Sequence, residues 1–156
     1  MNDILPTYFA PHEVQELHEL QGKVLDRVVY TIWRNVAKPT ESYEALEWVE
    51  LNFSDGSLMS LTAGEETTGI QLKELNFGLE QTRILQQFRG QVELERVEVN
   101  GHPVWQELID LPITGIGLVM LDRDLYPNNL LHLEFGSATV EFSLGEEGLL
   151  VKRTEG

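Results

Sequence analysis

The fold is decided by two stretches of sequence that follow one pattern: residues 46–73, LEWVELNFSDGSLMSLTAGEETTGIQLK, and residues 130–152, LLHLEFGSATVEFSLGEEGLLVK. Each begins with alternating apolar and polar residues that end in Phe, passes through a Gly-Ser turn into a second such segment, and reaches Gly-Glu-Glu before a third. Alternation of this kind is typical of strands with one buried face. Both stretches therefore predict antiparallel hairpins.

The alternation also predicts which side chains are buried. Side chains on one face of a strand recur at every second residue, so three apolar residues of each stretch are expected to point into the core: Val49, Leu51 and Phe53 in the first, and Leu131, Leu133 and Phe135 in the second. The turn at 54–57 is longer by two residues than the turn Gly136-Ser137. Internal duplication and coincidence under shared patterning rules both remain as explanations of the likeness.

The rest of the chain adds two helices and further strands. Pro11 suits the first turn of a helix over 12–21, which we expect to be small and to lie on the surface, and 79–88 predicts a second helix with Ile84, Leu85 and Phe88 on its inner side. We expect a strand at 23–34, a hairpin over 91–110 around Asn100-Gly101, and a buried strand at 113–121. A change of phase within the hairpin predicts either a bulge near Arg96 or a strand with both faces partly covered.

These elements predict a mainly β fold in one domain spanning residues 1–156. The expected architecture is an antiparallel sandwich or a curved half-barrel, with two short helices packed at its edge or mouth. A chain of 156 residues is long enough to bury a sizeable core without disulfides.

Negative charge dominates the composition and is unevenly distributed. The formal net charge is −15, from 26 acidic and 11 basic residues. No basic residue lies between Lys38 and Lys73, and Arg123 is the only basic residue from Val97 to Val151. Such a field repels nucleic acids and anionic membranes and favours a basic partner.

Composition also limits the compartment and the chemistry. There is no cysteine, which excludes disulfides and thiolate metal sites. The first residues lack a basic stretch followed by an apolar run, so we expect no signal peptide, and no window is apolar enough for a membrane span. The cytoplasm is the expected compartment.

Motifs for catalysis or cofactors are incomplete. Gly115-Ile116-Gly117 lacks the third glycine and the helix of a dinucleotide fingerprint, and we expect no cofactor. His12, Glu16 and Glu19 would share one helical face, which favours a solvated face over a metal site. Asp122, Asp124 and Asn128 match only part of a calcium loop. No serine lies in a Gly-x-Ser-x-Gly elbow.

Six residues are the candidates for binding. Trp48 is out of phase with Val49 and is expected either to be covered by a helix or to contact a partner. His132 projects from the face opposite to Leu131 and Leu133, as a general base or as an ordinary surface residue. If the two stretches pair as related hairpins, four carboxylates should converge on one sheet face: Glu47, Glu50, Glu134 and Glu141.

Three classes of function follow from these observations. The first is a non-enzymatic acidic protein that binds a basic protein partner, as immunity proteins and inhibitors do. The second is a small-molecule-binding or catalytic barrel, for which a cavity lined by His132 or His102 would be the sign. The third is a homo-oligomeric structural protein, for which an exposed apolar edge strand would be the sign.

Overall fold

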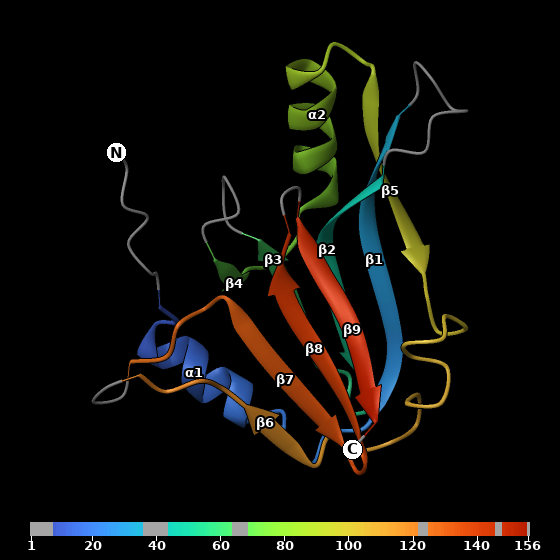
Figure 1. Cartoon of the computed structure of the whole chain (residues 1–156). Coiled ribbons are helices and arrows are strands. Elements are labelled where there is room, and N and C mark those ends of the chain that lie inside the picture. The colour runs from blue at the N-terminus through green and yellow to red at the C-terminus, as the bar shows by residue number, and fades with distance from the viewer. Residues whose placement is uncertain (1–7, 36–43, 64–68, 122–124, 146–147, 156) are drawn as a thin grey trace.

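Two antiparallel β-sheets pack face to face in the computed structural model, with one helix at the open end of the sandwich and one on its outer face (Figure 1). The structure describes residues 8–35, 44–63, 69–121, 125–145 and 148–155. The larger sheet has the order β4-β3-β2-β1-β5, and the smaller has the order β6-β7-β8-β9. The two sheets do not join into a closed barrel, so the mainly β prediction is confirmed in its sandwich form.

Each sheet is a succession of antiparallel neighbours. The five-stranded sheet consists of β1 (Leu25–Asn35), β2 (Glu44–Phe53), β3 (Leu58–Ala63), β4 (Ile70–Leu72) and β5 (Val92–Glu98). The four-stranded sheet consists of β6 (Gly115–Gly117), β7 (Leu130–Phe135), β8 (Ala138–Leu144) and β9 (Leu149–Glu155).

The two similar stretches of sequence form matching units, one in each sheet. The first gives β2-β3-β4 and the second gives β7-β8-β9, each a three-stranded antiparallel meander. The six predicted inward residues are all buried, and the rings of Phe53 and Phe135 are 3% and 4% exposed. The alternating pattern therefore predicted both the strands and their buried faces.

One hydrophobic core joins the two sheets. It contains the inward residues of both meanders together with Leu25, Val28, Trp105 and Ile113. The turn between β8 and β9 approaches β2 so closely that a Cβ at Gly148 would overlap the backbone oxygen of Leu46. Glycine at 148 is what allows this close packing.

Helix α1 (Pro11–His18) closes one end of the sandwich beside β4. It was expected to lie on the surface, but Leu17 and Leu20 are 0% and 3% exposed and belong to the core. One carboxylate oxygen of Glu13 accepts the Ala10 N–H at 2.8 Å as a helix cap, and the other accepts the Leu72 N–H of β4 at 3.1 Å. Glu13 thus protects the edge of the sheet and fixes the start of the helix.

Helix α2 (Phe77–Gln87) covers the other face of the five-stranded sheet. Asn76 caps it by accepting the Leu79 N–H at 3.2 Å. Ile84 is buried as predicted, but Leu85 is 38% exposed and does not lie on the inner side. The Gln81 side chain forms two hydrogen bonds with the backbone of Leu94, at 2.8 and 2.9 Å, and so covers part of the β5 edge.

The hairpin predicted over 91–110 is wrong. Only β5 forms, and the segment after it folds into successive turns that follow Pro103, whose ring suits the start of a helical turn. The Asn100 side chain accepts the Val28 N–H at 2.9 Å and so binds along β1. Trp105 is fully buried and donates its indole N–H to the hydroxyl of Tyr30 at 2.7 Å, where burial raises the Tyr30 pKa to about 12.

The buried strand predicted over 113–121 is also mostly wrong. Ile113 is buried and β6 pairs with β7, but three residues beyond β6 are exposed: Val119 by 42%, Met120 by 58% and Leu121 by 61%. Hydrophobicity alone does not distinguish a central strand from an apolar segment at the edge of a sheet.

Of the two alternatives for the change of phase near Arg96, the bulge is absent, since β5 pairs with β1 in continuous register, and both faces of β5 are partly covered instead. The irregularities lie between β1 and β2 instead, at Leu25/Arg27 and at Thr31/Ile32. Both helices of the described part of the chain are too short and too polar to span a lipid bilayer.

Candidate functional site

A β-bulge places Glu47 on the same face as its neighbour Trp48. Thr31 of β1 is opposite Trp48, and the next residue, Ile32, is opposite Leu46, so Glu47 is the extra residue on β2. The Thr62 hydroxyl donates to the Glu47 carbonyl at 2.8 Å, which satisfies the backbone at the bulge. Glu47 therefore faces α2 on the outer side of the five-stranded sheet.

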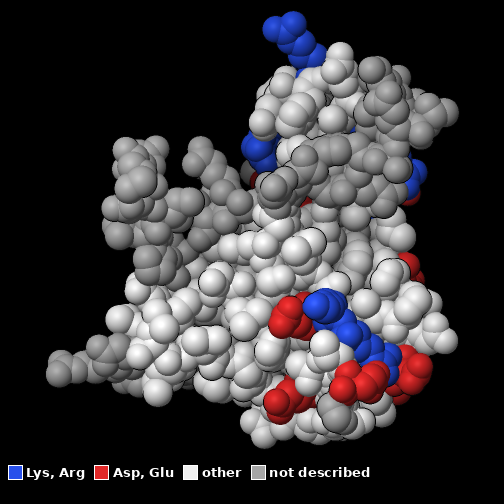
Figure 2. Space-filling view, viewed as in Figure 1, with Lys and Arg blue, Asp and Glu red and all other residues white. Residues whose placement is uncertain are grey.

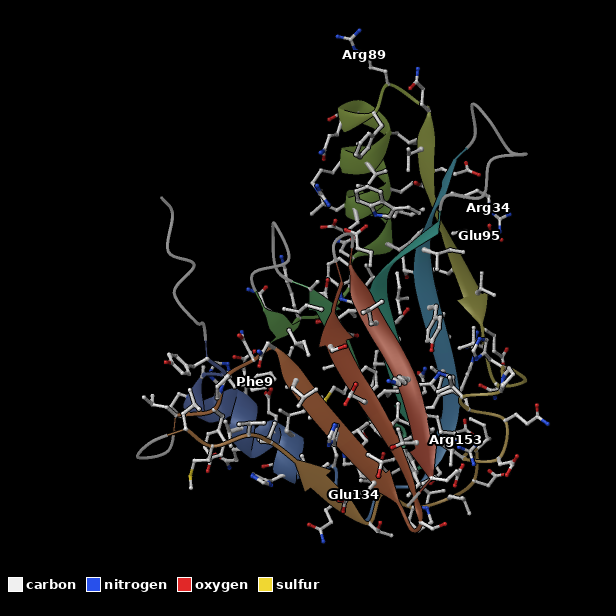
Figure 3. The ribbon with its side chains drawn as sticks, in the orientation of Figure 1. Phe9, Arg34, Arg89, Glu95, Glu134 and Arg153 are labelled. Carbon is white, nitrogen blue, oxygen red and sulfur yellow. The ribbon has the colours of Figure 1, made fainter. Side chains whose placement is uncertain are left out.

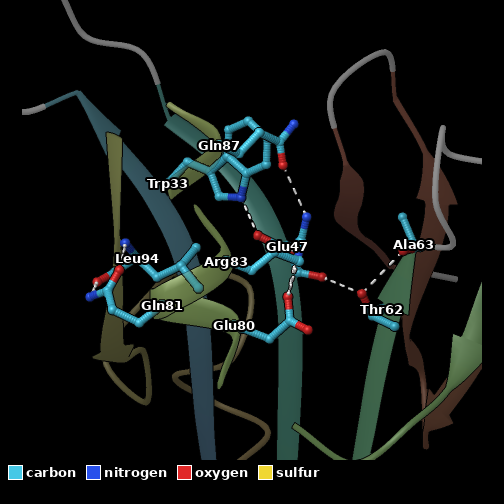
Figure 4. Close-up of polar contacts among 9 residues, drawn as sticks. All are labelled: Trp33, Glu47, Thr62, Ala63, Glu80, Gln81, Arg83, Gln87 and Leu94. Atoms are coloured by element: carbon cyan, nitrogen blue, oxygen red, sulfur yellow. Dashed lines mark hydrogen bonds and ion pairs between the residues drawn. The ribbon is translucent and has the colours of Figure 1, made fainter. Parts of the chain in front are cut away.

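The Glu47 carboxylate lies in a polar network beneath α2 (Figure 4). It accepts the indole N–H of Trp33, and it forms an ion pair with Arg83 of α2 at 3.1 Å. Arg83 also binds Glu80 at 2.9 Å. Burial raises the pKa of the Glu47 carboxyl above its usual value, although Trp33 and Arg83 lower it. These contacts attach α2 to the sheet.

The raised pKa of Glu47 predicts a pH-dependent effect of the substitution Glu47→Gln. Because the folded protein disfavours the charged carboxylate, the stability associated with this group is full below its usual pKa of 4.5 and is lost as pH rises through the higher folded value. The free energy of unfolding of Glu47→Gln, measured relative to wild type, should increase from acidic to neutral pH. A difference that is constant with pH, or that decreases, would contradict this assignment.

Trp48 and Glu50 are also buried on this outer face. Trp48 is 4% exposed and donates its indole N–H to the carbonyl of Lys73 at 2.9 Å, in the segment that leads into α2. Glu50 is 7% exposed, and Arg96 of β5 donates to one of its oxygens from two nitrogens, at 2.8 and 3.1 Å. Trp48 is thus buried against the segment that precedes α2, and it is not exposed for a partner as the second alternative required.

His132, Glu134 and Glu141 lie on the outer face of the four-stranded sheet. His132 is opposite Glu141, and their side chains meet at 3.0 Å. Glu134 is exposed near one end of the sheet, far from α2 at the other end of the molecule (Figure 3). Lys152 is opposite Glu141 on this face. Arg153 is opposite the buried Val140 and pairs with Glu107 and Glu155. Figure 2 shows acidic and basic side chains close together on the side of the molecule in view.

The expected convergence of four carboxylates on one sheet face is therefore wrong. Glu47 and Glu50 lie on one outer face of the sandwich, and Glu134 and Glu141 lie on the other. The reason is that the two related meanders belong to different sheets, which pack through their inward faces, so their outward faces point apart.

Sequence reasoning missed a groove between α1 and the β3–β4 edge. One hollow of about 480 Å³ is lined by Glu16, Glu19 and Leu20 from the α1 side and by residues 58–60 and 72–74 from the sheet side. A second hollow of about 380 Å³ shares Leu72 and Lys73 with the first and extends to His12 and Asn128. Both volumes are in the range of roughly 300–1,000 Å³ that is typical of ligand sites.

The sequence contained a signal for the α1 wall of the groove, which is a set of polar residues on one helical face. His12, Glu16 and Glu19 were noted as one helical face, and all three line the groove. The described residues contain no group of three or more His, Asp or Glu side chains placed to hold a metal ion. Asp122 and Asp124 of the partial calcium spacing lie outside the described residues, whereas Asn128 is buried and binds Ile70.

No known protein family, curated protein or solved structure matches this chain. A function is therefore inferred from the groove, the sheet faces and the charge of the chain.

Proposed function

We propose that this protein is a non-enzymatic acidic binding protein that engages a basic protein partner, in the manner of immunity proteins and inhibitors. The proposal rests on one observation: basic side chains are paired with carboxylates of the same chain, while the sequence has a large excess of acidic residues. Among the described residues, six basic side chains form ion pairs with carboxylates: Lys23, Arg27, Arg34, Arg83, Arg96 and Arg153. With 26 acidic and 11 basic residues in the sequence, pairing within the chain can offset only part of the negative charge.

Charge of this kind favours association with a cationic surface. Unpaired carboxylates keep their long-range field, which attracts a basic partner and raises the rate of encounter. The His132–Glu141 pair lies on an open sheet face and lines neither hollow of the groove, so the proposal invokes no catalysis. A chain without cysteine suits a reducing compartment, and we propose the cytoplasm.

Capture from a native lysate tests this function. The immobilised chain is incubated with lysate at about 0.1 M salt, and the proteins that elute at higher salt are identified by mass spectrometry. We expect a reproducible partner with a basic surface that elutes well below 1 M salt and binds the chain again after purification. Recovery of only acidic or neutral proteins, or of partners that remain bound at about 1 M salt, would contradict the proposal.

A homo-oligomeric structural protein is the second candidate function. It is favoured by the exposed apolar residues 119–121 that follow β6, an edge strand of the smaller sheet. Exposed apolar residues next to a strand edge are a common basis of self-association. A molecular mass that rises with concentration in sedimentation would support this candidate, and a monomer at every concentration would exclude it.

A further inference from the structure

We infer that the groove between α1 and the β3–β4 edge is the docking site for an extended basic segment of the partner, one that alternates Lys or Arg with apolar side chains. This inference rests on the proposed function and names the site and the chemistry of the ligand. Figure 1 shows α1 and β4 on the same side of the molecule, where they form the two walls of the groove.

The base of the groove offers apolar contacts. Leu20 and Phe53 are buried within it, Met59 and Leu72 are partly exposed, and Leu58 is 48% exposed at its rim. An apolar side chain placed there would bury both its own surface and that of Met59 and Leu58. A ligand with cations alone would leave this surface in contact with water.

The rim of the groove offers unpaired negative charge. Glu16, Glu19 and Glu74 are exposed, and none of them forms an ion pair within the described residues. Lys23 also lines the groove, but its charge is offset by Asp55 at 3.4 Å and its ammonium donates to the Ser57 hydroxyl at 2.7 Å. Lys73 is left to oppose three carboxylates, so the rim carries a net charge of −2 (three negative, one positive).

The ligand is a peptide segment that lies along the groove without adding a strand to the sheet. β4 is an edge strand, but its Ile70 N–H already donates to the Asn128 carbonyl at 2.7 Å and its Leu72 N–H donates to Glu13. Because these backbone groups are satisfied, recognition by strand addition is blocked there. Side-chain contacts with the base and rim are what remain for binding.

A short peptide probe tests the inference by fluorescence anisotropy at about 0.05 M salt. The probe is Lys-Leu-Lys-Leu-Lys, with blocked ends and a fluorescent label, and its comparison is Lys-Ser-Lys-Ser-Lys. The groove variant is Glu16→Gln/Glu19→Gln/Glu74→Gln. The matched control removes three charges that lie outside the groove and form no ion pair among the described residues: Asp26→Asn/Glu93→Gln/Asp110→Asn.

The inference predicts that the groove variant binds the leucine probe about tenfold more weakly than wild type, because three favourable charge contacts are lost. The control variant should bind as wild type does, and wild type should prefer the leucine probe to the serine probe. Lys73→Gln should bind about twofold to threefold more tightly, since it removes the opposing cation from the rim. A gain of affinity of this kind does not arise from misfolding.

The other outcomes separate the site from the function. Equal losses in the groove and control variants would overturn the site, because overall charge would then account for binding, while the proposed function would stand. Equal affinity for the two probes would overturn the role of the apolar base. If wild type binds neither probe although a basic partner has been captured, the groove is not the site. If no basic partner is captured either, the proposed function also fails.

Discussion

Phe53→Ala and Phe135→Ala should each lower the free energy of unfolding by about 3–5 kcal/mol, as the loss of a buried aromatic ring does. The rings are 3% and 4% exposed and lie at the ends of β2 and β7, in the core that joins the two sheets. The core side chains around each ring are closely packed, so they are not expected to move far enough to fill the space that the ring leaves.

Denaturant unfolding measures this effect from the shift in the transition midpoint at constant slope. Leu79→Ala is the control, since Leu79 is 66% exposed on α2 and its truncation should change stability by less than about 0.5 kcal/mol. A loss below about 1 kcal/mol for either phenylalanine would mean that its ring is not part of a tightly packed core.

Arg96→Met should lower the free energy of unfolding by about 2–3 kcal/mol, because it leaves the Glu50 carboxylate buried without its partner. The Glu50 side chain is 9% exposed, whereas that of Arg96 is 43% exposed, so the cost falls below that of a fully buried pair. The double variant Glu50→Met/Arg96→Met should recover most of the loss, since no buried charge then remains.

The matched control for Arg96 is Arg27→Met, which breaks the Arg27–Glu98 pair. Both side chains of that pair are 50% exposed, so the change should cost about 1 kcal/mol or less. If Arg96→Met and Arg27→Met have equal effects, Glu50 is solvated and is again available to a partner, as the sequence first suggested.

Local alternation accounts for what the sequence predicted well. Val49, Leu51 and Phe53 and their three counterparts in β7 had to share a face, and a buried face requires a covering layer. The alternation does not extend through a bulge, so the side of the sheet on which Glu47 lies was not predictable from its position alone.

Tertiary contacts explain what the sequence did not predict. Asn100-Gly101 suited a tight turn, but the Asn100 amide binds along β1, a partner more than seventy residues away in the chain. The groove was not predicted for the same reason, because it depends on tertiary contacts. The acidic face of α1 was visible in the sequence, but its opposite wall comes from β3 and β4, and only folding brings the two walls together.

The salt dependence of the association rate is the most direct test of the central claim, that the surplus carboxylates recruit a basic partner. The rate constant for the purified partner is measured by stopped-flow between about 0.1 M and 1 M salt, over which the Debye length falls from about 10 Å to about 3 Å. The account predicts a steep fall in the association rate constant and a smaller change in the dissociation rate constant. An association rate that is indifferent to salt would contradict it.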